Sequence, residues 1–119
     1  MTTSTLAPTA PIGGPTLTQK RELVTAIPGP RSLELLERKK QSVAAAIGIT
    51  LPVFVEAAGG GVVRDVDGNT LIDFGSGIAV TGVGNSAPAV VEAVTQQVAQ
   101  FTHTCFMVTG YENYIAVAE

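Results

Sequence analysis

The hairpin pattern in the middle of the sequence constrains the fold of this chain more than any other feature. Two short apolar runs, residues 62–66 and 71–74, flank Asp67-Gly68-Asn69. Asp-Gly between β-type runs is typical of hairpin turns, because glycine tolerates the positive φ that tight turns need. A third run, residues 52–56, precedes a glycine triplet at 59–61. The pattern predicts a small antiparallel meander of three strands.

Apolar residues at helical spacing predict helices on both sides of the meander. Residues 32–47 form one amphipathic pattern that stops before Gly48. A second helix is expected to begin at Pro88, because proline fits the first helical turn. A third pattern runs from Tyr111 to Glu119 without a Gly, Asn or Pro stop signal, so this helix is expected to be unfinished.

The expected fold class is α/β, with an α+β character within this stretch. In chain order, we expect an amphipathic helix, the small antiparallel meander, a glycine-rich loop and two helices. Residues 1–30 are expected to be a disordered tail and linker, because Thr, Ala, Pro and Gly dominate their first half. Residues 31–119 are expected to be an incomplete domain, since 45% hydrophobic residues and a mean hydropathy of +0.34 exceed what so short a chain buries.

Charge and apolar patterning exclude several classes of function. Residues 41–119 carry one arginine and seven acidic residues, which argues against a nucleic-acid-binding surface. The richest apolar stretch, residues 43–55, is interrupted by glycine, threonine and proline, so no membrane span is expected. The single cysteine, Cys105, forms no internal disulfide and fits a reducing compartment, so a cytoplasmic location is expected.

Two motifs are similar to ligand-binding loops but do not meet their requirements. A calcium loop needs glycine at position six and glutamate at position twelve, whereas Gly68 is fourth from Asp65 and strands flank the motif. Gly82-Val83-Gly84 is half of a dinucleotide fingerprint whose third glycine is replaced by Ala87. A hairpin turn is favoured for the first motif, and no metal-binding or cofactor-binding residue is predicted.

His103 and Cys105 form the remaining candidate for local chemistry. A metal needs three or four ligands, and the chain has no other histidine or cysteine. Catalytic Cys–His pairs are usually far apart in sequence. A buried loop histidine with a satisfied hydrogen bond is therefore expected. The three lysines, Lys20, Lys39 and Lys40, lie in the tail and on a solvated helix face, so none is predicted to form a Schiff base and no catalytic residue is assigned.

Three stretches together resemble the class-III (omega) aminotransferases. Residues 66–80, V-D-G-N-T-L-I-D-F-G-S-G-I-A-V, are similar to the family's D-x-D-G-n-x-y-I-D-F-x-s-G-i-a-V opening. Residues 84–94 continue the likeness. H-T-C-F at 103–106 and Y-E-x-Y at 111–114 resemble the 4-aminobutyrate (GABA) subgroup. The resemblance covers roughly residues 50–119, with the first two stretches identifying the class and the third the subgroup.

One departure from the family pattern falls at the start of the second stretch. Many members have G-H-x-H-P where this chain has Gly84-Asn85-Ser86-Ala87-Pro88. The helix start survives this change because it depends on proline and not on imidazole.

The resemblance implies a dimeric fold-type-I enzyme with active sites at the subunit interface. Such enzymes use pyridoxal 5'-phosphate to move an amino group from an omega-amino acid to 2-oxoglutarate. It also implies that Ile78 touches the substrate chain and that Met107 holds a pocket position often filled by glutamine. Gly77, His103 and Cys105 are expected to support the pocket or the interface. The family's lysine and cofactor-binding residues lie further along than residue 119.

Three hypotheses follow for the function. The first is that the chain is the N-terminal part of a 4-aminobutyrate–2-oxoglutarate transaminase, a homodimer or dimer of dimers, and is inactive by itself. The second keeps the class and changes the substrate to ornithine, acetylornithine or another omega-amine. The third is a truncated, non-catalytic chain that associates through its apolar face.

Overall fold

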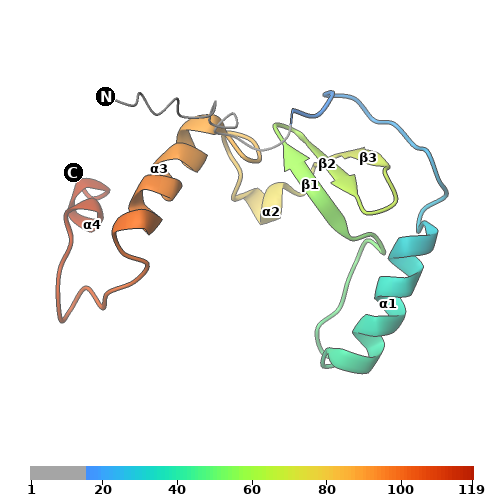
Figure 1. Ribbon diagram of the computed structural model, residues 1–119, viewed down its shortest axis with the longest axis horizontal. Helices are drawn as coiled ribbons and strands as arrows, with labels where there is room; N and C mark the ends of the chain where they lie inside the picture. The colour runs from blue at the N-terminus through green and yellow to red at the C-terminus, as the bar shows by residue number, and fades with distance from the viewer. Residues whose placement is uncertain (1–15) are drawn as a thin grey trace, which may run out of the picture.

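The computed structural model describes residues 16–119, so residues 1–15 of the expected disordered tail lie outside the described residues. Four helices and three strands follow one another in the described part (Figure 1). Their order is α1 (Pro30–Ser42), β1 (Val55–Gly59), β2 (Val62–Asp65), β3 (Thr70–Ile72), α2 (Ser76–Ala79), α3 (Pro88–Gln100) and α4 (Glu112–Ala116). Helices with a small sheet are consistent with the predicted α/β class.

The three strands form the predicted antiparallel meander. Their order is β1-β2-β3, with β2 in the centre. Val62 opposes Gly59 on one side and Ile72 on the other. Among residues 16–119, Val62 is also the one hydrophobic residue that is buried, with 2% of its surface exposed. The two turn signals therefore predict the order of pairing correctly, but the first strand is Val55–Gly59 and not residues 52–56 as expected.

The helices begin close to the predicted positions but end earlier. Pro30 starts α1 two residues ahead of the prediction, and Gly29 is its N-cap. Val43 is extended, with φ −114° and ψ 136°, and ends α1 well before residue 47. α3 begins at Pro88 as predicted. The predicted run of α4 to residue 119 is too long, because short helices need tertiary packing to persist and the helix ends at Ala116.

The turn between β2 and β3 caps helix α1 across a long sequence separation. The two carboxylate oxygens of Asp67 accept hydrogen bonds from the backbone N–H groups of Arg31, at 2.7 Å, and Ser32, at 2.9 Å. The Ser32 hydroxyl donates to the same carboxylate at 2.5 Å. A side chain at Gly29 would come within 2.3 Å of the Asp67 carboxyl carbon. Glycine is therefore required where α1 approaches the turn.

A buried pair within the same turn fastens the N-terminal linker to the sheet. Asp65 and Asn69 are both fully buried. Asp65 accepts hydrogen bonds from the Asn69 backbone and side-chain N–H groups, each at 2.8 Å, and from the Asp67 backbone at 2.9 Å. Asn69 Oδ1 in turn accepts from the Val24 and Thr25 backbone N–H groups at 2.9 Å. The Asp65 oxygens thus serve the hairpin turn that the sequence favours at this motif.

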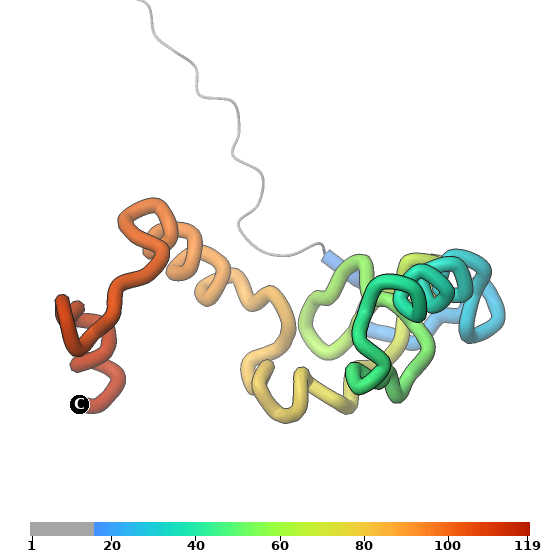
Figure 2. The backbone as a smooth tube through the Cα atoms, turned by 90° about the horizontal axis from the view of Figure 1, so that it is seen from below, coloured from blue at the N-terminus to red at the C-terminus, as the bar shows by residue number. Residues whose placement is uncertain are grey.

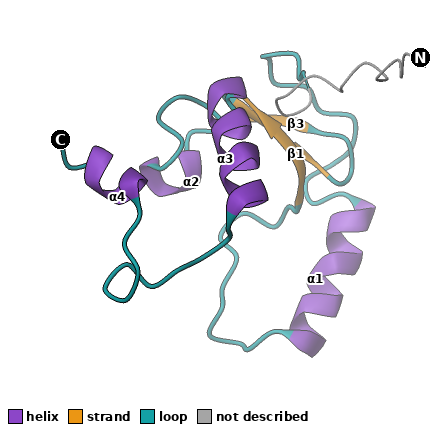
Figure 3. Cartoon of the chain, turned by 60° about the vertical axis from the view of Figure 1, so that its left-hand side comes forward, coloured by secondary structure: helices purple, strands orange, loops and turns teal. Residues whose placement is uncertain are grey.

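The described elements are spread out and do not surround one apolar core. The radius of gyration is 19.0 Å, against about 13–14 Å for a compact domain of this length. The part from α3 onward lies apart from α1 and the sheet (Figure 2), and a long loop joins α3 to α4 (Figure 3). Val90, Val94 and Val98 on α3 are each at least 50% exposed. This apolar face of α3 therefore lacks a partner within residues 16–119.

The substitution Asn69→Ala is expected to release the linker from the sheet. It removes the shared acceptor of Val24 and Thr25, and an unsatisfied buried group costs about 1–3 kcal/mol. Amide hydrogen exchange at those two residues should accelerate about 10- to 100-fold. Asn113→Ala, at an exposed site on α4, is the matched control. Unchanged protection in the Asn69 variant would contradict the role assigned to this side chain.

The titration of Asp67 provides a second test of the helix cap. Desolvation raises the pKa of this carboxyl, but the hydrogen bonds from Ser32 and from the Arg31 backbone outweigh it, so the pKa lies below its ordinary value of 3.8. A depressed pKa means that the cap is complete above that value and is lost as the pH falls through the folded pKa. In Ser32→Ala, the pKa of Asp67 should move upward, as measured by carboxyl ¹³C titration. Ser42→Ala, at the other end of α1, should leave it unchanged, and equal shifts in both variants would refute the cap.

Candidate functional site

The glycine-rich loop contains a single left-handed turn. Ser76, Gly77, Ile78 and Ala79 have φ values of 44°, 61°, 62° and 61°. Left-handed backbone costs a residue with a side chain roughly 1–2 kcal/mol, and a β-branched residue such as isoleucine is a marked outlier there. The turn presents Ile78 to solvent with 94% of its surface exposed. No sequence signal predicts this conformation, because only one of the four residues is glycine.

Hydrogen bonds at the start and end of the loop hold this strained turn. Asp73 Oδ1 accepts from the backbone N–H groups of Gly75, at 3.0 Å, and Ser76, at 2.8 Å. Asp73 Oδ2 accepts from Asn85 Nδ2 at 3.0 Å. The Asn85 backbone pairs with Gly60 through two hydrogen bonds of 2.8 and 2.9 Å. We refer to Asp73, Asn85 and Gly60 as the loop base; the sequence reasoning assigned none of them a role.

A second exposed loop lies between α3 and α4 and carries the other predicted site residues. Met107 is 92% exposed, and His103 and Cys105 are exposed as well. The expected burial of His103 is therefore wrong, because nothing in the described chain covers this loop. Within residues 16–119, no three His, Cys, Asp or Glu side chains are grouped so as to hold a metal ion.

Aromatic side chains give the second loop its shape. Phe106 packs against Tyr111 and Tyr114, with ring centroids 5.3 and 4.4 Å apart, and Phe101 lies 5.8 Å from Tyr111. Such contacts contribute roughly 0.5–1.5 kcal/mol per pair beyond burial. Phe106 thus links the loop to α4.

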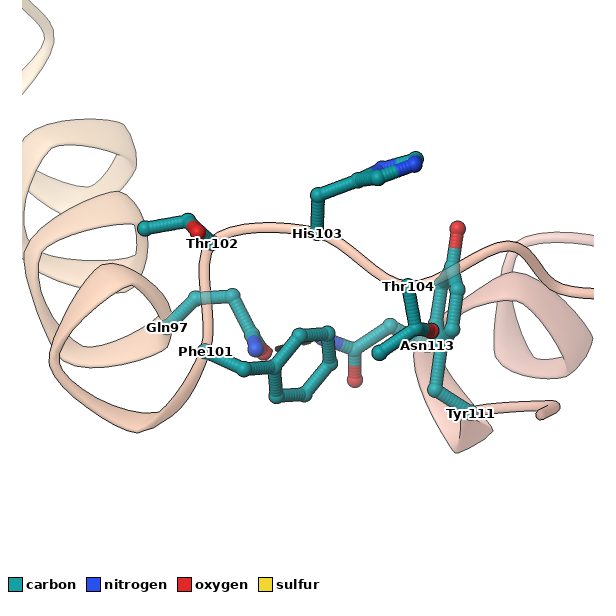
Figure 4. A pocket seen from close by; sticks show the side chains of 7 residues that line it. All are labelled: Gln97, Phe101, Thr102, His103, Thr104, Tyr111 and Asn113. Atoms are coloured by element: carbon teal, nitrogen blue, oxygen red, sulfur yellow. Dashed lines mark hydrogen bonds between the residues drawn. The ribbon is translucent and has the colours of Figure 1, made fainter.

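A small cavity of about 180 Å³ opens beside these rings (Figure 4). Its lining residues are Gln97, Phe101, Thr102, His103, Thr104, Tyr111 and Asn113. On its floor, Asn113 Nδ2 donates to Gln97 Oε1 at 2.8 Å. Gln97 accepts in this bond, and its own side-chain donor, Nε2, is shielded from solvent and has no partner among the described residues. The cavity is therefore polar at its base and aromatic on its side.

The structure does not bring the two predicted substrate-contacting residues together. Ile78 lies in the left-handed turn labelled α2, next to the sheet, whereas Met107 follows α3. Helix α3 separates the two loops (Figure 1). A helix of 13 residues spans about 20 Å. If both residues serve one pocket, other protein surface must complete it.

Comparison with known proteins assigns most of the chain to one family model. Residues 43–119 match the model described as aminotransferase class-III. This range includes both exposed loops and the whole sheet. No helix in residues 16–119 is long and apolar enough to cross a membrane.

Several curated proteins are similar to this chain over most of its length. The 4-aminobutyrate aminotransferase of Mycobacterium tuberculosis is 66% identical over 103 residues, which is 87% of this chain and 23% of that protein. The 5-aminovalerate aminotransferase of Pseudomonas putida is 42% identical over 71% of this chain and 20% of its own length. An alanine/serine racemase of Pyrococcus horikoshii is 39% identical over 82% of this chain and 21% of its own length. The chain thus spans less than a quarter of these relatives.

The substitution Phe106→Ala is expected to loosen the second loop without unfolding the sheet. It removes the ring that contacts both Tyr111 and Tyr114. The ring proton resonances of both tyrosines should move toward values typical of an exposed chain, as measured by NMR of tyrosine-labelled protein. Phe74→Ala is the matched control, because Phe74 is 92% exposed. Unchanged tyrosine resonances in Phe106→Ala would contradict the packing described here.

Proposed function

This chain belongs to the class-III aminotransferases, and we propose from that membership that it is the N-terminal part of a 4-aminobutyrate–2-oxoglutarate transaminase. The observation that carries the proposal is the identity of 66% with the Mycobacterium tuberculosis 4-aminobutyrate aminotransferase over 87% of this chain. The reaction transfers the amino group of an omega-amino acid to 2-oxoglutarate. Pyridoxal 5'-phosphate supplies the covalent chemistry, while protein supplies binding and orientation.

The described residues do not by themselves fit a covalently bound pyridoxal phosphate. Lys20 and Lys40 face Glu22 and Glu37, at 3.9 and 3.1 Å respectively. The Lys39 ammonium donates a hydrogen bond to the backbone carbonyl of Ile47. A Schiff-base lysine needs a site that keeps its amine free to react. Neither exposed loop contains a lysine, and no catalytic step is assigned to these three.

The two exposed loops support a role in substrate contact. We assign Ile78 to the surface that touches the substrate chain and Met107 to the pocket wall. Gly77, His103 and Cys105 are assigned to support of the pocket or the subunit interface. The support is their exposure: Ile78 and Met107 are each more than 90% exposed, although residues of this size are usually at least partly buried.

The open arrangement supports a fold-type-I homodimer, or a dimer of dimers, in which further protein covers the apolar faces. Exposed apolar surface this extensive is rare in proteins that act as monomers. More than half of the surface is exposed for Val94 and Val98 on α3 and for Ile78 and Met107 in the loops, so these residues are available for such contacts. A cytoplasmic location belongs to the same proposal and rests on the reducing compartment expected from the single cysteine.

The alternatives within the class differ in the carbon-chain length of the amino donor. The 5-aminovalerate aminotransferase has one more methylene in its named substrate and is 42% identical in this region. Ornithine and acetylornithine remain alternative donors within the class. A non-catalytic chain is the alternative from another class, and the exposed face of α3 is the feature that favours it.

Activity of the product of the complete reading frame tests the proposal. Purified with pyridoxal phosphate, it is expected to form glutamate from 4-aminobutyrate and 2-oxoglutarate. A pocket that discriminates by one methylene gives about a 10- to 200-fold preference, so kcat/KM should be lower for 5-aminovalerate and ornithine. A protein that prefers ornithine would favour the alternative donor, and one without transaminase activity would contradict the proposal.

Residues 1–119 expressed by themselves are expected to be inactive. Pyridoxal phosphate should give no stable, stoichiometric aldimine absorbance, because neither exposed loop contains a lysine. The appearance of such a band would contradict the assignment of the covalent chemistry to residues beyond 119.

A further inference from the structure

We propose that Asn85 is a positioning residue which, through Asp73, holds the left-handed turn of residues 76–79 so that Ile78 is presented to the amino donor. The inference rests on the proposed function for the identity of the ligand. It goes beyond that function in naming the interaction that sets the conformation of the substrate loop. Asn85 itself makes no contact with the reacting atoms.

The turn needs an external constraint because its own sequence does not favour it. Three of its four left-handed residues carry side chains, and each costs roughly 1–2 kcal/mol in that conformation. Four backbone hydrogen bonds lie within the turn: Ile78 N and Ala79 N donate to Gly75 O at 2.7 and 3.2 Å, and Val80 N and Thr81 N donate to Ser76 O at 2.8 and 3.1 Å. Ile78 gains no stabilisation from packing, since its side chain is almost fully exposed. The residues that flank the turn therefore supply the rest of the constraint.

Asp73 supplies this constraint because one carboxylate oxygen binds the turn and the other binds Asn85. Oδ1 accepts the N–H groups of Gly75 and Ser76, which fixes the entry into the turn. Oδ2 accepts Asn85 Nδ2 at 3.0 Å, across a separation of 12 residues. Without a donor at position 85, the carboxylate keeps its local bonds but loses the contact that fixes its orientation relative to the sheet.

Asn85 connects Asp73 to the rigid part of the chain. Its backbone forms two hydrogen bonds with Gly60 in the β1–β2 turn. The neighbouring Gly84 has φ +90°, and a side chain there would come within 3.1 Å of the Gly60 Cα. The close approach of these two backbones places the Asn85 side-chain amide beside the Asp73 carboxylate. The residues that precede and follow the loop are thereby joined.

Asparagine at position 85 keeps the hydrogen-bond donor that the geometry demands. The departure from G-H-x-H-P replaces an imidazole, whose ring N–H also donates, by an amide with the same capacity. What this position has to provide is therefore an N–H group facing Asp73, and not a titratable ring. A carboxylate in its place would face Asp73 across about 3 Å, where two like charges repel.

A reciprocal exchange in the complete protein, with pyridoxal phosphate bound, separates this role from a general structural one. Asn85→Asp should accelerate amide exchange at Gly75 and Ser76 and raise the KM for 4-aminobutyrate about tenfold, with kcat changed less than about twofold. Adding Asp73→Asn should restore both values, because the new amide donates to the new carboxylate while its oxygen still accepts from the loop. Gln100→Glu, which adds the same charge at an exposed site on α3, should change neither.

The outcomes distinguish the loop base from the proposed function. If Asn85→Asp leaves exchange at Gly75 and Ser76 unchanged, or if the double variant is no better than the single one, the loop base does not hold the turn. If exchange responds and the KM does not, the positioning role is overturned. If the unaltered protein has no transaminase activity while exchange follows the expected pattern, the proposed function fails and the loop base stands.

Should Asn85→Asp fail to fold, Asn85→Ala removes the donor without adding charge and is expected to give a smaller change in the same direction.

Discussion

The polar turn between β2 and β3 holds the linker, α1 and the sheet together. Asp65 and Asn69 are fully buried and satisfy each other, and Asp67 caps α1 from the same turn. Because buried polar groups are costly unless they are hydrogen-bonded, this network has few alternative arrangements. Val62 is the buried hydrophobic residue among residues 16–119, so the described chain has almost no apolar core. Polar contacts, in place of apolar packing, hold the linker and α1 against the sheet.

The sequence predicts those parts of the fold that depend on local signals. Asp67-Gly68-Asn69 indicates the hairpin, and Pro88 indicates the start of α3, because turn and helix-start preferences act within a few residues. The partners of Asp67 lie 35 and 36 residues away, and no local pattern indicates them. The predicted burial of His103 fails for a related reason: burial depends on what covers a loop, and its own residues do not specify that.

The candidate site also combines features that the sequence predicts with features that only the structure reveals. The class of enzyme and the two loops can be inferred from the motif resemblance, which residues 43–119 support by matching the family model. The left-handed turn at Ile78 cannot, since Ser-Gly-Ile-Ala carries one residue that favours positive φ. Asp73 and Asn85 were missed because each is unremarkable within its own segment. Their relation is visible only once β3 and the start of α3 have been placed against the β1–β2 turn.

The position of the strained turn follows from where the chain is most constrained. β3 ends at Ile72, and the next residue, Asp73, donates its backbone N–H to Gly61 at 2.9 Å. Its carboxylate therefore begins from a backbone fixed on the same sheet whose other turn carries Asp65 and Asn69. A loop built directly on such an element is oriented more closely than one at the end of a free segment. The exposed conformation of Ile78 is thus sustained by the hairpin, through a short series of hydrogen bonds, and not by packing around Ile78 itself.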